Sequence, residues 1–117
     1  MHDFRQLQVW QRWRQLAVAL DAVTRTFPRS DHGVVGGQLR RAALSIPANI
    51  AEGCGKSSRR ETIRFLEIAC GSARETENHL LIAADPGYMR VSACEQFSGD
   101  IKSIQRMLAG LISKLPK

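Results

Sequence analysis

Apolar side chains recur along most of this chain at alternating three- and four-residue steps, the spacing of one face of an α-helix. Glycine, proline and polar residues interrupt this spacing at three places. The pattern predicts an all-α protein with helices over residues 4–26, 34–53, 58–84 and 91–115. Because the connections are short, consecutive helices are expected to be antiparallel neighbours in an up-down-up-down four-helix bundle.

The first predicted helix carries both tryptophans of the chain, Trp10 and Trp13. Tryptophan buries a large area with few rotatable bonds, so packing is favoured over stacking of Trp13 on a nucleic-acid base. Together with Val9 and Val18, these side chains cannot all face one bundle core. We therefore expect apolar surface that a second subunit buries, and hence a homo-oligomer.

The second predicted helix contains a proline. Its apolar spacing continues past Pro47 to Ile50, although proline removes a backbone donor and crowds the carbonyl four residues earlier. We expect one helix kinked at Pro47, with Gly53 as a left-handed stop. The alternative is a helix break, with Ala48–Glu52 forming a separate turn.

Polar residues mark the expected helix starts. Asp31 is placed to cap the second helix. The third helix begins with a capping box, in which the Ser58 hydroxyl accepts from the amide of Glu61 and the Glu61 side chain reaches back to Ser58. The same spacing, from Ser92 to Glu95, predicts a capping box at the start of the fourth helix.

The central helix resembles the signature of a known family. Residues 38–43 read QLRRAA and residues 45–53 read SIPANIAEG. Shorter matches occur in the same order along the chain, at Leu7 with Val9–Gln11, Phe27–Pro28, Arg64–Leu66 with Ile68–Ala69, Gly71–Ser72 and Gly87–Tyr88. These residues resemble the small bacterial four-helix-bundle proteins that are encoded in 23S rRNA intervening sequences.

The resemblance implies a four-helix bundle and a ring-shaped pentamer. It also associates the chain with ribosomal RNA operons. A more distant similarity is to the accessory protein of diversity-generating retroelements, which is implied to bind nucleic acid and a reverse transcriptase. RNA and DNA both remain open on the residues alone, and the resemblance favours RNA.

Length and composition limit the alternatives. The 117 residues suffice for a single domain over 1–117, and 44% hydrophobic content argues against disorder. No apolar run is long enough for a membrane span, and the N-terminus has no apolar segment typical of a signal peptide. The three cysteines are widely spaced without a CxxC pair, as is usual for reduced thiols, so we expect a cytoplasmic protein.

The net charge of +6 lies entirely in the first half of the chain. Residues 1–60 hold ten Lys or Arg and four Asp or Glu, whereas residues 61–117 hold seven of each. A basic excess favours an acidic partner such as nucleic acid. The predicted nucleic-acid-binding residues are Arg40, Arg41, Lys56, Arg59 and Arg60. Arg64 is the weakest candidate, because Glu61 and Glu67 are spaced to pair with it.

Catalysis finds no support in the spacing of reactive residues. The segment Gly55–Ser57 lacks the second glycine of a phosphate-binding loop. The three histidines share neither a helical face nor ligand spacing with the cysteines, so no metal or other cofactor is expected. Ser45, Asn49 and Glu52 would supply a hydroxyl and a carboxylate with no base placed to activate the hydroxyl. They are expected instead to satisfy backbone groups freed by Pro47.

Two classes of function therefore remain. The first is a non-catalytic, oligomeric nucleic-acid-binding protein that uses the basic residues above. The alternative is a protein-interaction or structural oligomer, whose partner is a polypeptide such as a polymerase and which has no direct role on nucleic acid. An enzyme is not expected.

Overall fold

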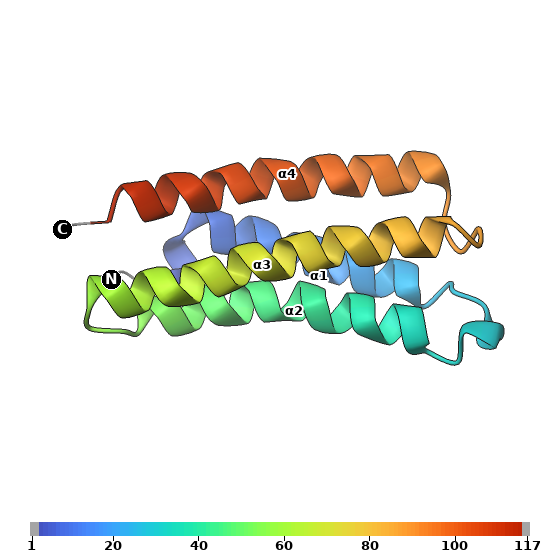
Figure 1. Cartoon of the computed structure of the whole chain (residues 1–117), viewed down its shortest axis with the longest axis horizontal. Helices are drawn as coiled ribbons and strands as arrows, with labels where there is room; N and C mark the ends of the chain where they lie inside the picture. Colours follow the sequence, from blue (N-terminus) through green and yellow to red (C-terminus); the bar gives the residue numbers. More distant parts are fainter. Residues whose placement is uncertain (1–2, 116–117) are drawn as a thin grey trace.

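The structure, a computed structural model, describes residues 3–115, which form four α-helices and two short 3-10 helices. The elements in chain order are η1 (Phe4–Gln6), α1 (Gln8–Thr24), η2 (Arg29–Asp31), α2 (Val34–Cys54), α3 (Arg59–Ala84) and α4 (Val91–Ser113). Consecutive α-helices run in opposite directions along one long axis (Figure 1). The prediction of an all-α four-helix fold is confirmed.

One hydrophobic core draws on all four α-helices. Its largest fully buried apolar side chains are Trp13, Leu20, Leu39, Ile46, Ile50, Leu66, Leu80, Ile101, Ile104 and Leu108. Their burial drives assembly at about 25 cal/mol per Å² of apolar surface removed from water. The contact between α2 and α3 is the most extensive in the bundle, and that between α1 and α4 is much smaller. No helix within residues 3–115 is both long and apolar enough to cross a membrane.

The two tryptophans of α1 occupy different environments. Trp13 is completely buried, with 0% of its surface exposed, so its ring cannot stack on a nucleic-acid base. Val9 is also buried, whereas Trp10 is half-buried and Val18 is 68% exposed. The expectation that these side chains do not all face one core is confirmed. Apolar surface consequently remains on the outside of α1.

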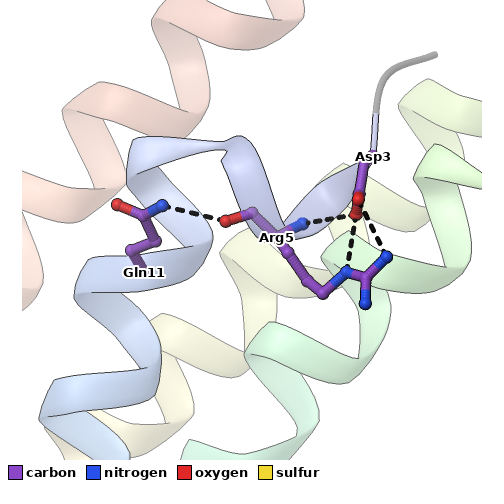
Figure 2. Close-up of polar contacts among 3 residues, drawn as sticks. All are labelled: Asp3, Arg5 and Gln11. Carbon is purple, nitrogen blue, oxygen red and sulfur yellow. Dashed lines mark hydrogen bonds and ion pairs between the residues drawn. The ribbon is translucent and has the colours of Figure 1, made fainter.

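The predicted first helix over 4–26 is too long at its start. In Figure 2 the Asp3 carboxylate accepts from both the backbone amide and the guanidinium of Arg5, which closes η1. The side-chain amide of Gln11 donates to the Arg5 carbonyl at 2.9 Å. Leu7 is extended and separates η1 from α1. A local carboxylate contact therefore competes successfully with continuation of the helix.

Polar side chains also fix the connection between α1 and α2. The Thr24 hydroxyl donates to the Asp21 carbonyl and accepts from the Arg40 guanidinium at 2.9 Å. The α1 helix ends at Thr24, two residues before its predicted boundary. The carboxylate of Asp31 accepts from the amides of Val35 at 3.0 Å and Gly36 at 3.1 Å. These are two of the free amides at the start of α2, so the predicted cap is confirmed.

The α2 helix continues through Pro47, so the alternative with a break and a separate turn over 48–52 is wrong. A kink at Pro47 stays a prediction. Proline leaves the carbonyl four residues earlier without its helical donor. Ser45 and Asn49 bond other carbonyls near Pro47, each on its own preceding turn, at 2.8 Å and 2.7 Å. Neither side chain bonds the Ala43 carbonyl that Pro47 frees, so the expectation that they satisfy it is wrong.

The expectation that Gly53 is a left-handed stop is wrong. Gly53 lies inside α2, and the helix ends at Cys54. Its role is to allow close approach: a Cβ atom there would lie 3.2 Å from both the Thr62 carbonyl oxygen and the Phe65 Cβ. The Thr62 hydroxyl donates to the Gly53 carbonyl at 3.0 Å. Glycine is therefore required because α3 passes against the backbone of α2.

The two predicted capping boxes have different outcomes. The Ser58 hydroxyl accepts from the Glu61 amide at 3.2 Å and caps α3 as expected. The hydrogen bonds of the described residues include no return bond from the Glu61 side chain, so only this half of the box is confirmed. The predicted cap at Ser92 is wrong, because α4 already begins at Val91 and its N-terminal flanking residue, Arg90, makes no side-chain cap. Ser92 therefore lies within the first turn. The α4 helix ends at Ser113, within two residues of the predicted boundary.

We predict opposite effects for alanine at buried and open glycines. Gly53→Ala should lower the free energy of unfolding by about 1–3 kcal/mol, because neither the α3 backbone nor the Phe65 Cβ can move aside independently. Gly71→Ala and Gly99→Ala, with open space around each, should raise it by about 0.5–1 kcal/mol. Chemical denaturation followed by circular dichroism measures these changes, and a Gly53→Ala variant as stable as the parent would contradict the close-approach interpretation.

Candidate functional site

The turn between α2 and α3 brings together three of the predicted nucleic-acid-binding residues. Lys56 lies in the turn, and Arg59 and Arg60 open α3. Arg59 and Arg60 are exposed, and Lys56 is half-buried. Figure 1 shows this turn at one end of the bundle, where α2 ends beside the start of α3. The short connection thus concentrates positive charge at that end.

Phe65 organises the basic side chains next to the turn. The Lys56 Nζ lies 5.1 Å from the centroid of the Phe65 ring, and the Arg64 guanidinium carbon lies 5.9 Å from it. Both distances are within the range of cation–π attraction. Among residues 3–115, Arg64 forms no ion pair with Glu61 or Glu67, so its expected pairing is wrong. The sequence reasoning missed Phe65, although an aromatic residue among basic ones is a recognisable signal.

A shallow depression of about 740 Å³ lies over the start of α3. It is lined by Ser58, Arg59, Arg60, Glu61, Ile63, Arg64 and Glu67. Three guanidinium groups outnumber two carboxylates, so the lining has a net positive charge. The backbone amides of Arg59 and Arg60 precede the first helical hydrogen bonds of α3 and favour an anion. The positive charge of the lining and the free amides at the start of α3 therefore both favour the binding of an anion.

Arg40 and Arg41 lie apart from this group. Arg41 is thirteen residues before the end of α2, which corresponds to about 20 Å of helix. The Arg40 guanidinium donates to Thr24 and is partly buried between α1 and α2. The structure thus joins Lys56, Arg59 and Arg60 and separates the other two predicted residues from them.

A second surface feature is an apolar groove of about 350 Å³ between α1 and α2. It is lined by Trp10, Arg14, Ala17, Val18, Asp21, Arg40, Leu44 and Pro47. Leu44 is 60% exposed and Val18 is 68% exposed. Large apolar side chains that face solvent together are typical of contact surfaces. The sequence indicated the contribution of α1 to this groove but not that of Leu44.

The residues weighed for catalysis or metal binding lie in separate places or make backbone contacts. Within residues 3–115, no group of three or more His, Cys, Asp or Glu side chains is placed to hold a metal ion. His32 follows η2 and His79 lies on α3, while His2 is outside the described residues. The hydroxyl of Ser45 donates to a backbone carbonyl, and so does the side-chain amide of Asn49. Neither group is activated by a neighbouring base, so their contacts are structural.

Comparisons with known proteins agree with this bundle. A sequence profile described as 23S rRNA-intervening sequence protein matches residues 5–110. No curated protein matches the chain. A solved structure of a protein of unknown function, from the S23 ribosomal protein family of Bacteroides thetaiotaomicron VPI-5482, is similar with a TM-score of 0.80 and 28% identity, covering 89% of this chain and 97% of that one. The resemblance inferred from the central helix is confirmed, and the chain belongs to the 23S rRNA-intervening sequence protein family.

Proposed function

We propose that this protein binds nucleic acid without catalysis, through Lys56, Arg59 and Arg60 at the α2–α3 turn. The observation that carries the proposal is a group of cations that form no ion pair within residues 3–115 and outnumber the carboxylates around them. Within the described residues, ion pairs involve only Arg5, Arg25 and Lys102 among the basic side chains. Unpaired guanidinium groups can give both their parallel donors to phosphate oxygens.

Arg64 extends this binding surface along α3, whereas Arg40 and Arg41 are outside it. Arg40 is engaged with Thr24, and Arg41 is about 20 Å away along α2. RNA is the favoured nucleic acid, because the family is named for a sequence inserted in 23S rRNA. A cytoplasmic location is part of the proposal and is supported by the three free cysteines.

The second proposal is self-association through the α1–α2 groove. Val18 and Leu44 are more than half exposed on either side of it, and the half-buried Trp10 ring adds large apolar area. A second copy that covers this groove removes these side chains from water. The pentameric state is the number that the family resemblance implies. Repeating the α2–α3 turn around a symmetry axis would let weak phosphate contacts add in one complex.

Replacing Lys56, Arg59 and Arg60 together by glutamine should weaken binding to RNA and DNA about tenfold or more at low salt. The slope of log K against log salt should flatten by about 2 to 3, since each phosphate contact contributes about 0.7 to 0.9. Fluorescence anisotropy at several salt concentrations measures both quantities. Circular dichroism should be unchanged, because Arg59 and Arg60 are exposed and Lys56 is not in the core.

The matched control replaces Arg25, Arg29 and Arg90 by glutamine. These residues are exposed; Arg25 follows α1, Arg29 opens η2 and Arg90 precedes α4. Figure 1 shows the end of α1 and the start of α4 at the end of the bundle opposite the α2–α3 turn, and the control removes the same charge from the chain. It should therefore lower affinity much less than the turn variant does. Equal losses in the two variants would mean that only net charge matters, and an absence of salt-dependent binding by the unaltered protein would end the proposal.

Val18→Asp together with Leu44→Asp should dissociate the oligomer. A carboxylate placed in an apolar contact must be desolvated without a partner, which costs several kcal/mol of association free energy. Light scattering should then report the mass of one 13.0 kDa chain, whereas the unaltered protein should give a multiple of it. The control Val91→Asp changes a valine that is 63% exposed at the start of α4 and should leave the mass unchanged. A monomeric unaltered protein at micromolar concentration would exclude self-association.

A further inference from the structure

A second group of basic side chains lies across α3 and α4. A depression of about 400 Å³ is lined there by Cys70, Arg74, Lys102, Gln105, Arg106 and Ala109. Arg74 comes from α3, and Lys102 and Arg106 come from one face of α4. All three are exposed. Residues distant in sequence thus form one surface with three cations and an amide donor.

No carboxylate lines this depression. The nearest charge partner is Glu77, whose Oε2 lies 3.8 Å from the Lys102 Nζ, a weak pair whose lysine is 62% exposed. Arg74 and Arg106 form no ion pair within the described part of the chain. Burial raises the pKa of the Cys70 thiol, Arg74 opposes that rise, and Glu67 adds to it. The local field at the depression therefore includes a positive contribution from Arg74.

We propose that Arg74, Lys102 and Arg106 form a second contact surface for the backbone phosphates of the nucleic acid that binds at the α2–α3 turn. This inference depends on the proposed function. Two guanidinium forks, an ammonium group and an amide suit phosphate oxygens. The lining has no aromatic or large aliphatic side chain of the kind that anchors a protein partner.

The geometry of α3 lets one nucleic acid reach both surfaces. Arg60 and Arg74 are fourteen residues apart, which is almost four helical turns and about 21 Å. Both side chains therefore project from nearly the same side of α3. Phosphates of one strand in duplex DNA are about 3.4 Å apart along the axis, so 21 Å corresponds to about six base pairs. A longer duplex lying along α3 contacts both surfaces, and a shorter one contacts only one.

The first experiment compares duplexes of about 5 and about 20 base pairs, as RNA and as DNA, in fluorescence anisotropy. The α3–α4 variant combines Arg74→Gln, Lys102→Gln and Arg106→Gln. It should bind the long duplex about tenfold more weakly, and its slope of log K against log salt should flatten by about 2 to 3. Affinity for the short duplex should fall much less, because a short duplex can still bind at the unaltered α2–α3 turn. The control variant at Arg25, Arg29 and Arg90 removes the same charge and should affect the long duplex less.

A second experiment needs no substitution at the basic residues. Cys70 is partly exposed, whereas Cys54 and Cys94 are buried, so an alkylating reagent should modify Cys70 first in the folded protein. Saturating long duplex should slow this modification several-fold, because it covers the depression that Cys70 lines. The short duplex should give little protection. Mass spectrometry of the digested protein identifies the modified cysteine.

The outcomes separate the two proposals. If the substitutions at the α2–α3 turn weaken binding, while the α3–α4 variant binds the long duplex normally and Cys70 stays unprotected, this inference is wrong and the proposed function stands. If the unaltered protein binds neither RNA nor DNA, both are wrong. Length-dependent loss of affinity together with protection of Cys70 supports the α3–α4 surface.

Discussion

The close approach of α2 and α3 is the constraint on which the rest of this bundle depends. At Gly53 a single added methyl group would lie 3.2 Å from α3 atoms, and Thr62 donates directly to the Gly53 carbonyl. The connection between the two helices is short and ends in the Ser58 cap. The Lys56 Nζ lies over the ring of Phe65, the same residue that approaches Gly53, and Arg59 is exposed at the start of α3. Phe65 thus connects the close approach of the helices with a cation of the basic turn.

The surfaces of the bundle differ in chemical character from one pair of neighbouring helices to the next. Between α1 and α2, exposed Val18 and Leu44 leave an apolar groove, which suits a contact with another copy. Over α3 and at its junction with α4, the side chains that point outward are mainly charged, and arginines outnumber the acidic residues that line the two depressions. A protein with an apolar groove on one side and cations on another can associate with itself and still present phosphate-binding groups.

The candidate site could be predicted only where its residues are close in sequence. Three basic residues lie close together in sequence at the α2–α3 turn and the start of α3, namely Lys56, Arg59 and Arg60. They therefore remain close together in the folded protein. Arg40 is recruited by Thr24, sixteen residues earlier, a pairing that no local spacing indicates. The α3–α4 surface was missed because residues 61–117 have balanced charge. The net charge of a long segment does not reveal cations from two different helices that lie together in the folded protein.

The sequence by itself determined the four helices and their order along the chain, because helical spacing of apolar residues is a local property. It also determined the Asp31 and Ser58 caps, since these bonds span only a few residues. Tertiary structure alone decided the role of Gly53, because the need for glycine arises from the α3 backbone rather than from its neighbours in sequence. It likewise decided which cations share a surface, since that depends on how α3 and α4 are packed. The local spacing of apolar residues specifies the helices, and only the packing of the helices specifies which side chains come into contact.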